Sequence, residues 1–281
     1  MLTPLSSRAR ALGVVVVLAL LLSGCGSLLD GPVDRYPESL GPTPSKSPTT
    51  PREKLAASVP TYRTPAFSWS MVNEGARWDW TDSAGVVNPA GKSYRLTNVV
   101  RDPEYGLVTN WHILVVHPRT WVKIVVDNPR QVDGVPEFPG KWGLVDQDRV
   151  TDKSIALTWD LWSNDPAYVE DLFRAVVDVT ETHPGVFEGT IDVTAAPAAE
   201  AVDTKIVTAL GPKAKAVPFH ARLDPQGRFR DLVLTVPATA KTKAVVHRIA
   251  YRDYGRTPAA VPPTAAETAP ITEDVYELIN S

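Results

Sequence analysis

Apolar and polar residues alternate along most of the chain between residues 66 and 254, a period typical of strands with one buried face. The pattern is clearest where Val217, Phe219 and Ala221 alternate with Pro218, His220 and Arg222 before the turn sequence Asp224-Pro225-Gln226-Gly227. Val, Ile, Tyr and Trp are also enriched there, as strands prefer. The pattern predicts strands at 66–72, 76–82, 94–99, 112–117, 120–127, 185–195, 217–223, 228–236 and 245–254.

Helix start signals and helical spacing separate some of these strands. Pro51 opens a short helix, with Thr50 as its cap. After Asp165-Pro166, apolar residues spaced i, i+3, i+4 and i+7 predict a helix over 165–178, and a similar pattern predicts one over 198–210. Antiparallel strands joined by tight turns, with helices able to cover one face, indicate an α+β fold.

A short basic stretch and an apolar run of about a dozen residues precede Cys25, the only cysteine. The run is shorter than the roughly 20 residues that a membrane-spanning helix needs. The ending Leu22-Ser23-Gly24-Cys25 resembles the bacterial lipobox, which implies diacylglyceryl transfer to Cys25 and cleavage before it. The alternatives are an ordinary signal peptide with an incidental cysteine, or a buried helix. A lipidated Cys25 would anchor the protein at the outer face of the cytoplasmic membrane and leave no cysteine for a disulfide.

The rest of the chain divides by composition. Pro, Ser, Gly and Thr dominate the segment after Cys25, which predicts a tether without a packed core. A second Pro/Ala-rich stretch near the C-terminus precedes a short helix expected at 272–279. The expected divisions are a signal peptide at 1–24, a lipid-anchored tether at 25–50, a globular domain at 51–256 and an extension at 257–281.

Charge and motifs argue against several classes of function. Removing residues 1–24 takes away two positive charges, which leaves 27 Lys+Arg against 32 Asp+Glu and a net charge of −5. This mild acidity argues against nucleic-acid binding and against a polybasic dock on anionic lipid. The five histidines form no HExxH pattern, and no nucleophile elbow or phosphate loop is present. Asp146, Asp148 and Asp152 lack the Gly and Glu of a calcium loop and indicate a solvated turn. We therefore expect no enzyme activity, metal or cofactor.

Tryptophan is unevenly distributed, because all eight indoles lie between residues 69 and 162. These residues fit the core of the first half of the sheet. They also fit an aromatic-lined pocket for an apolar ligand, or a stacking platform for a cell-wall sugar. The sequence leaves these alternatives open.

Several segments together resemble actinobacterial lipoproteins of the LppX/LprG type over roughly residues 60–256. The segments that carry the resemblance are 120–124, 141–146, 172–176, 184–192, 217–230 and 251–255. The resemblance implies a LolA-like half-barrel, in which a strongly curved antiparallel sheet wraps over a few helices with an apolar cavity between the layers. Members of that superfamily carry acylated lipids or lipoproteins, so the resemblance implies a lipid ligand and no catalytic residues.

We therefore expect a lipid-anchored extracytoplasmic protein that binds an apolar ligand between the sheet and the helices at 165–178 and 198–210. An alternative is a structural or adaptor lipoprotein with a filled core, whose surface binds an envelope protein. A cell-wall glycan binder or enzyme is a third. The residues expected to line the cavity, all equally compatible with a plain core, are Trp121, Leu172, Phe173, Val176, Val202, Ile206 and Phe219.

Overall fold

The computed structural model of the protein describes residues 48–74, 82–102, 104–151, 165–195, 202, 204–240 and 243–280. The expected signal peptide, the tether with Cys25 up to residue 47, and the strand expected at 76–82 except for Asp82 lie outside these residues.

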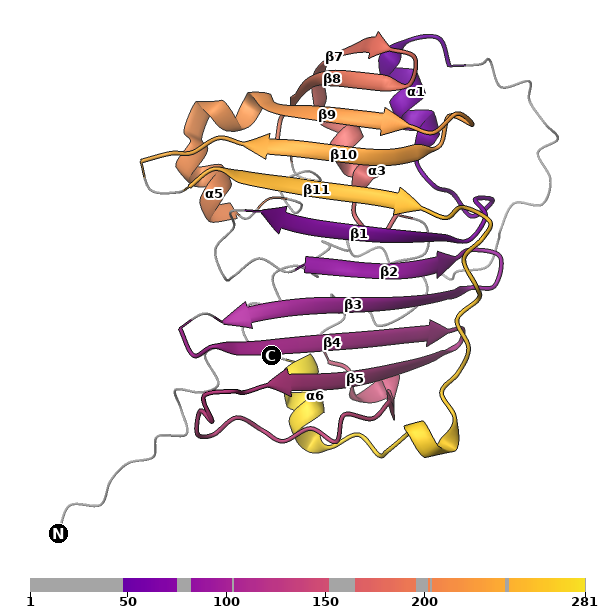
Figure 1. Ribbon diagram of the computed structural model, residues 1–281, viewed down its shortest axis with the longest axis vertical. Helices are drawn as coiled ribbons and strands as arrows, with labels where there is room; N and C mark the ends of the chain where they lie inside the picture. The colour runs from indigo at the N-terminus through magenta and orange to yellow at the C-terminus, as the bar shows by residue number, and fades with distance from the viewer. Residues whose placement is uncertain are drawn as a thin grey trace.

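An open antiparallel sheet of eleven strands forms the frame of the molecule, in the order β6-β5-β4-β3-β2-β1-β11-β10-β9-β8-β7 (Figure 1). Pairing of the first strand with the last joins the two halves of the sheet, with Trp69 opposite Tyr251. The strands are β1 (Phe67–Glu74), β2 (Asp82–Asn88), β3 (Ser93–Asp102), β4 (Leu107–Val116), β5 (Arg119–Asp127), β6 (Gly143–Leu144), β7 (Val176–His183), β8 (Val186–Ile191), β9 (Val217–Leu223), β10 (Phe229–Val236) and β11 (Val245–Arg252).

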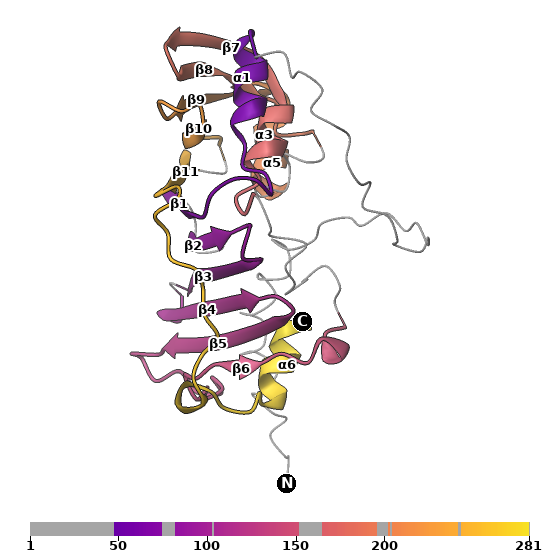
Figure 2. The ribbon, with the colours of Figure 1, turned by 90° about the vertical axis from the view of Figure 1, so that its right-hand side faces the viewer.

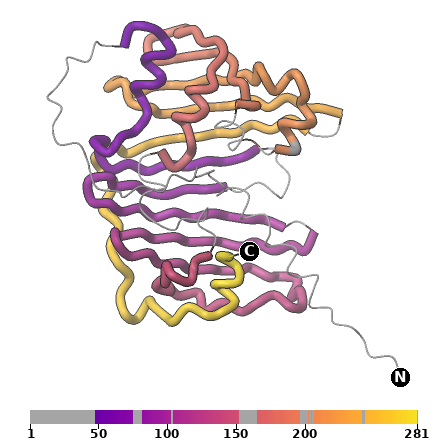
Figure 3. The backbone as a smooth tube through the Cα atoms, turned by 180° about the vertical axis from the view of Figure 1, so that it is seen from behind, coloured from indigo at the N-terminus to yellow at the C-terminus, as the bar shows by residue number. Residues whose placement is uncertain are grey.

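The helices lie on one side of this sheet, in two groups over its two ends. Figure 2 shows α1, α3 and α5 beside the strands from β7 to β11, and α6 beside β5 and β6. Seen from behind in Figure 3, all of them lie in front of the sheet. The helices are α1 (Pro51–Ser58), α3 (Val169–Arg174), α5 (Thr204–Leu210) and α6 (Glu273–Ile279), with short 3-10 turns η4 (Gln147–Arg149), η5 (Gly211–Ala216) and η6 (Ala265–Glu267).

Strand alternation gives the sheet an inner face, toward the helices, and an outer face. On β11, Val245, His247, Ile249 and Tyr251 are buried, while the residues between them are partly or fully exposed, as the sequence predicts. The outer face of the central strands carries ion pairs, including Arg101 with Asp82 at 2.6 Å. The predicted antiparallel sheet with few helices on one face is therefore confirmed.

The predicted turn between β9 and β10 is also confirmed. The Gly227 N–H donates to the Asp224 carbonyl at 2.9 Å, and the Asp224 carboxylate accepts from the N–H groups of Gln226 and Arg228 at 2.9 Å each. Gly227 has φ +75°, which glycine adopts without steric cost.

One helix prediction needs correction, and a second is described only in part. The helix predicted at 165–178 is only α3, because the chain enters β7 at Val176 and pairs with β8. Val176, Val177, Val179 and Thr180 are β-branched and favour this strand, and the hairpin with β8 outweighs the helical spacing. Of the helix predicted at 198–210, the structure describes α5 and the single residue Val202 before it; 196–201 and 203 lie outside the described residues.

The C-terminal segment beyond residue 256 packs onto the sheet. The Trp142 N–H donates to the Glu267 carbonyl, and the Ala269 N–H donates to the Trp142 carbonyl, both at 2.9 Å. Val275, Tyr276 and Ile279 of α6 are buried, and the Tyr276 hydroxyl accepts from the Asp146 N–H at 2.9 Å. The helix predicted at 272–279 is thus confirmed and covers the inner face near β5.

Candidate functional site

Six of the seven residues expected to line a cavity lie in the main hydrophobic core. Leu172 and Phe173 come from α3, Ile206 from α5 and Phe219 from β9; Val176 and Val202 complete the set. Their exposed fractions lie between 0% and 8%. Phe173 packs edge-on against Phe229 of β10, with 5.8 Å between ring centroids. These side chains form the close-packed core between the helices and the sheet.

Trp121, the seventh, lies on the opposite side of the sheet. Its neighbours along β5, Val122 and Ile124, belong to the inner core and face the C-terminal segment. Because successive strand residues point to opposite faces, Trp121 points outward, beside Leu114 and Leu144 of the adjacent strands. The expectation that Trp121 lines a space between the sheet and the helices is therefore wrong.

Two other tryptophans occupy the centre of the inner face. Trp69 of β1 and Trp111 of β4 are both almost fully buried in the main core. Gly85 lies opposite Trp69 on β2, and a Cβ atom there would lie 2.9 Å from the indole nitrogen and 2.2 Å from the Arg95 carbonyl oxygen. Glycine at this position therefore makes room for the Trp69 indole across β2.

Buried polar pairs lie among these aromatic residues. The Ser83 hydroxyl donates to the Asn98 side-chain oxygen at 2.7 Å, and this oxygen belongs to a residue directly opposite Trp111. The His247 Nδ1 atom hydrogen-bonds to the Asn73 side-chain oxygen on the neighbouring strand. Burial lowers the pKa of His247 to about 4, so the imidazole is neutral at pH 7. An apolar surface with a few paired polar groups is the composition of many ligand sites.

A carboxyl–phenol contact fixes the segment before α3 to the sheet. The Tyr251 hydroxyl donates to the Asp165 carboxylate and accepts from the Ala167 N–H at 3.2 Å. Asp165 also accepts from the Glu170 N–H at 2.6 Å. Asp165 as a whole is partly exposed, but its carboxyl group is desolvated. Desolvation raises the pKa of Asp165 to about 6, although these hydrogen bonds act to lower it. The predicted start signal Asp165-Pro166 therefore acts as a tertiary anchor ahead of the helix.

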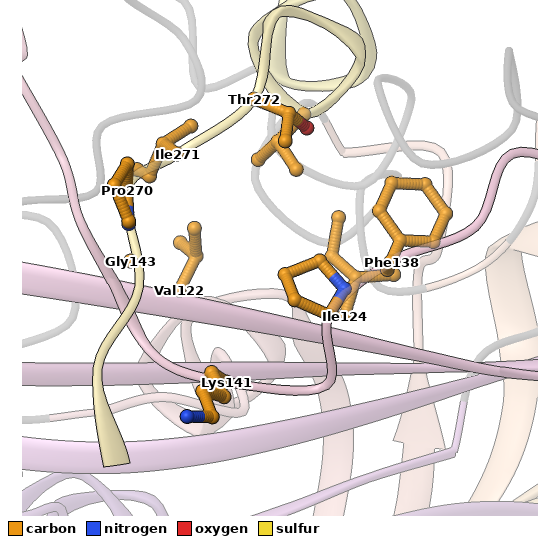
Figure 4. Close-up of a pocket in the computed structure, with 10 residues that line it drawn as sticks. Val122, Ile124, Phe138, Lys141, Gly143, Pro270, Ile271 and Thr272 are labelled. Carbon is orange, nitrogen blue, oxygen red and sulfur yellow. The ribbon is translucent and has the colours of Figure 1, made fainter. Parts of the chain in front are cut away.

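A small pocket lies between β5 and the C-terminal segment. Figure 4 shows Pro270 and Ile271 on one side, Ile124 and Phe138 on the other, and Val122 between them. Its cavity volume is about 20 Å³, roughly the space of one water molecule. A pocket of this size does not hold a lipid chain as it stands.

The described part of the chain contains no cluster of three or more His, Cys, Asp or Glu side chains placed to hold a metal ion. Within the same residues, no helix combines the length and apolar character needed to cross a membrane. No family model of known proteins matches the chain, and no curated protein matches its sequence.

Sequence reasoning missed the polar partners of the inner face. His247 lies on the buried face of its strand, and its partner Asn73 is 174 residues away in the sequence. The available signal is a polar residue at a strand position where the alternation predicts a buried apolar one. It identifies a buried polar group but not the strand that pairs with it.

Proposed function

We propose that this protein is an extracytoplasmic lipoprotein, anchored to the membrane through a lipid on Cys25, which binds an apolar ligand on the inner face of a LolA-like half-barrel. The observation that carries the proposal is the arrangement of the sheet: one broad apolar face, with the described helices gathered over its two ends (Figure 2). The central strands between these groups contribute the buried indoles of Trp69 and Trp111 to that face.

Because the described residues are closely packed, the proposed ligand enters by separating a helix from the sheet. The contacts at the two ends differ in kind, which supports this route. α3 is held by a fully buried apolar core, including Leu172 and Phe173. α6 is held through exposed polar contacts, such as the Arg149–Glu273 ion pair, besides its three buried side chains. Since exposed ion pairs contribute little, α6 is the helix that moves at lower cost.

Two mass measurements test the proposal. Protein extracted from the membranes of its host should carry a diacylglyceryl group, and Cys25→Ser should remove it. Native mass spectrometry of the Cys25→Ser protein should still detect a noncovalent lipid, because the anchor and the ligand site are separate. A bare protein mass in the second experiment, together with no uptake of a fluorescent fatty acid, would contradict ligand binding.

Two observations favour a second function: the filled interior around the predicted lining residues and the small volume of the pocket near α6. These features fit an adaptor lipoprotein that holds an envelope protein partner on its surface. The two functions differ in a simple readout: an adaptor retains its partner after cross-linking in cells and carries no lipid other than its anchor.

A further inference from the structure

A group of cationic and aromatic side chains lies on the outer face of the sheet, away from the proposed apolar site. Thr97 of β3, His112 of β4 and Lys123 of β5 stand directly opposite one another in consecutive strand pairs. Arg95 lies two residues before Thr97 and so shares its face. Trp142 completes the group, which we call the outer cluster: Arg95, Thr97, His112, Lys123 and Trp142.

The indole of Trp142 lies beside His112 and Lys123 of the outer cluster. Its ring centroid lies 6.3 Å from that of His112 in an edge-on arrangement and 5.2 Å from the Lys123 ammonium. The backbone hydrogen bonds of Trp142 with Glu267 and Ala269 fix the main chain from which the ring projects. The outer cluster is thus a platform built by three strands and the C-terminal segment, rather than a chance meeting of surface side chains.

The polar atoms of the outer cluster are only partly used. The Thr97 hydroxyl and His112 Nδ1 are hydrogen-bonded at 2.9 Å. Within the described part of the chain, His112 Nε2 makes no hydrogen bond, and neither Arg95 nor Lys123 forms an ion pair. Next to Thr97 the row continues with the small side chains of Ala84 and Ser70, which leave space above the sheet.

Carboxylates near this surface are engaged elsewhere. Asp82 pairs with Arg101 at 2.6 Å. Glu267 accepts from the Thr264 hydroxyl and N–H at 2.7 and 2.8 Å, and these bonds, with a smaller contribution from Lys123, lower its pKa. Burial, followed by the charges of Lys123 and Arg95, lowers the pKa of His112. Glu267 therefore offsets part of the charge of Lys123, and with Arg95 the outer cluster keeps a net positive charge on a chain whose net charge is −3.

We propose that the outer cluster binds an anionic saccharide, a sugar that carries a phosphate or carboxylate group. Lys123 and Arg95 pair with the acid group, and His112 Nε2 hydrogen-bonds to it. The Trp142 indole provides apolar surface for the sugar ring, as aromatic side chains commonly do for flat apolar faces. This site is separate from the inner face, so failure of one proposal does not contradict the other.

Glucose 6-phosphate, inorganic phosphate and glucose are suitable probes, with binding followed by NMR or calorimetry on the full-length protein. Glucose 6-phosphate should bind at least tenfold more tightly than either phosphate or glucose. Lys123→Gln should weaken its binding at least tenfold, and Trp142→Leu should reduce it to the level of phosphate. The matched control Lys213→Gln, in the exposed turn η5, should bind like the wild-type protein.

A second readout follows from the charge of the ligand. A bound anion stabilises the imidazolium of His112, so glucose 6-phosphate should raise the pKa of His112 in an NMR titration, and binding should tighten as the pH falls. Unchanged affinity in Lys123→Gln, or an unmoved His112 resonance at saturating ligand, would overturn the proposal. Equal binding of phosphate and glucose 6-phosphate would also overturn it, because no sugar is then recognised.

Discussion

Replacing His247 or Asp165 should reveal two pH dependences of opposite sign that cancel in the wild-type protein. Between pH 4 and 6.5 the unfolded chain binds a proton at His247 that the folded chain does not, because burial lowers the folded pKa from 6.5 to about 4. The folded state therefore loses stability as the pH falls through this range. At 1.36 kcal/mol per pH unit, the total change is about 3 kcal/mol.

Asp165 acts in the other direction. Its folded pKa of about 6 lies above the value of 3.8 for an unperturbed carboxyl group, so the folded chain holds a proton that the unfolded chain has lost. Its contribution to stability is complete below pH 3.8 and disappears as the pH rises to 6. The loss is again about 3 kcal/mol. Between pH 4 and 6 the two groups offset each other.

The single variants separate these effects. In His247→Gln the opposing contribution of the histidine is lost, so, relative to the wild-type protein, the free energy of unfolding should fall by about 3 kcal/mol from pH 4 to pH 6. In Asp165→Asn it should rise by a similar amount. The comparison uses slopes against pH, so any constant loss of stability in a variant does not affect it.

Urea unfolding followed by tryptophan fluorescence, at half-unit steps of pH and constant ionic strength, measures these slopes. His183→Gln, at an exposed position at the end of β7, is the matched control and should run parallel to the wild-type protein. If both variants keep the wild-type slope, the burial of His247 and of the Asp165 carboxyl group is refuted.

Two further substitutions test the packing at the two ends of the sheet. Leu172 has no exposed surface, so Leu172→Ala should lower the free energy of unfolding by about 2–5 kcal/mol. Leu144 is 53% exposed, so the control Leu144→Ala should lower it by less than about 1 kcal/mol. Equal losses in urea unfolding would contradict this. Gly143→Ala places a Cβ atom 2.2 Å from Ile271 Cγ1 and should destabilise the C-terminal segment, and a double-mutant cycle should show that Ile271→Ala restores part of the loss. Strictly additive losses would mean that Gly143 and Ile271 do not meet.

The alternation of apolar and polar residues along the sequence is enough to predict much of the sheet. Strands β1, β3 and β9 to β11 follow from it because each has one largely buried and one largely solvated face, which makes the two-residue period visible. The turn before Arg228 follows from its residues, since Asp224 and Gly227 each make the hydrogen bonds that such turns use. β2 could not be assigned, because its apolar residues Val86 and Val87 are adjacent and Gly85 interrupts the period.

The region around α3 shows how tertiary pairing overrides local spacing. Val169, Leu172, Phe173 and Val176 are all buried and do follow a helical period, but Val176 reaches the core as the first residue of β7. The neighbouring Val177 is 54% exposed on this edge strand, so the strand has no strong apolar alternation of its own. Only the pairing with β8 distinguishes the two structures.

The candidate sites were harder to predict than the strands. Trp121 is among the residues expected to line the inner cavity, yet Val122 beside it occupies the inner face. Where apolar residues are adjacent, sequence alone does not set which of them points inward. The outer cluster depends on the pairing of Thr97, His112 and Lys123, and such cross-strand register follows from the fold rather than from the sequence.

Tryptophan quenching by a brominated fatty acid tests the central claim, binding of an apolar ligand at the inner face, most directly. Bromine quenches an indole only at short range, and the same unbrominated fatty acid controls for changes in conformation. The account predicts quenching that is strongly reduced when Trp69 and Trp111 are both replaced by Phe and is retained in Trp142→Phe, whose indole lies on the outer face. Absence of quenching, or quenching lost only in Trp142→Phe, would contradict it.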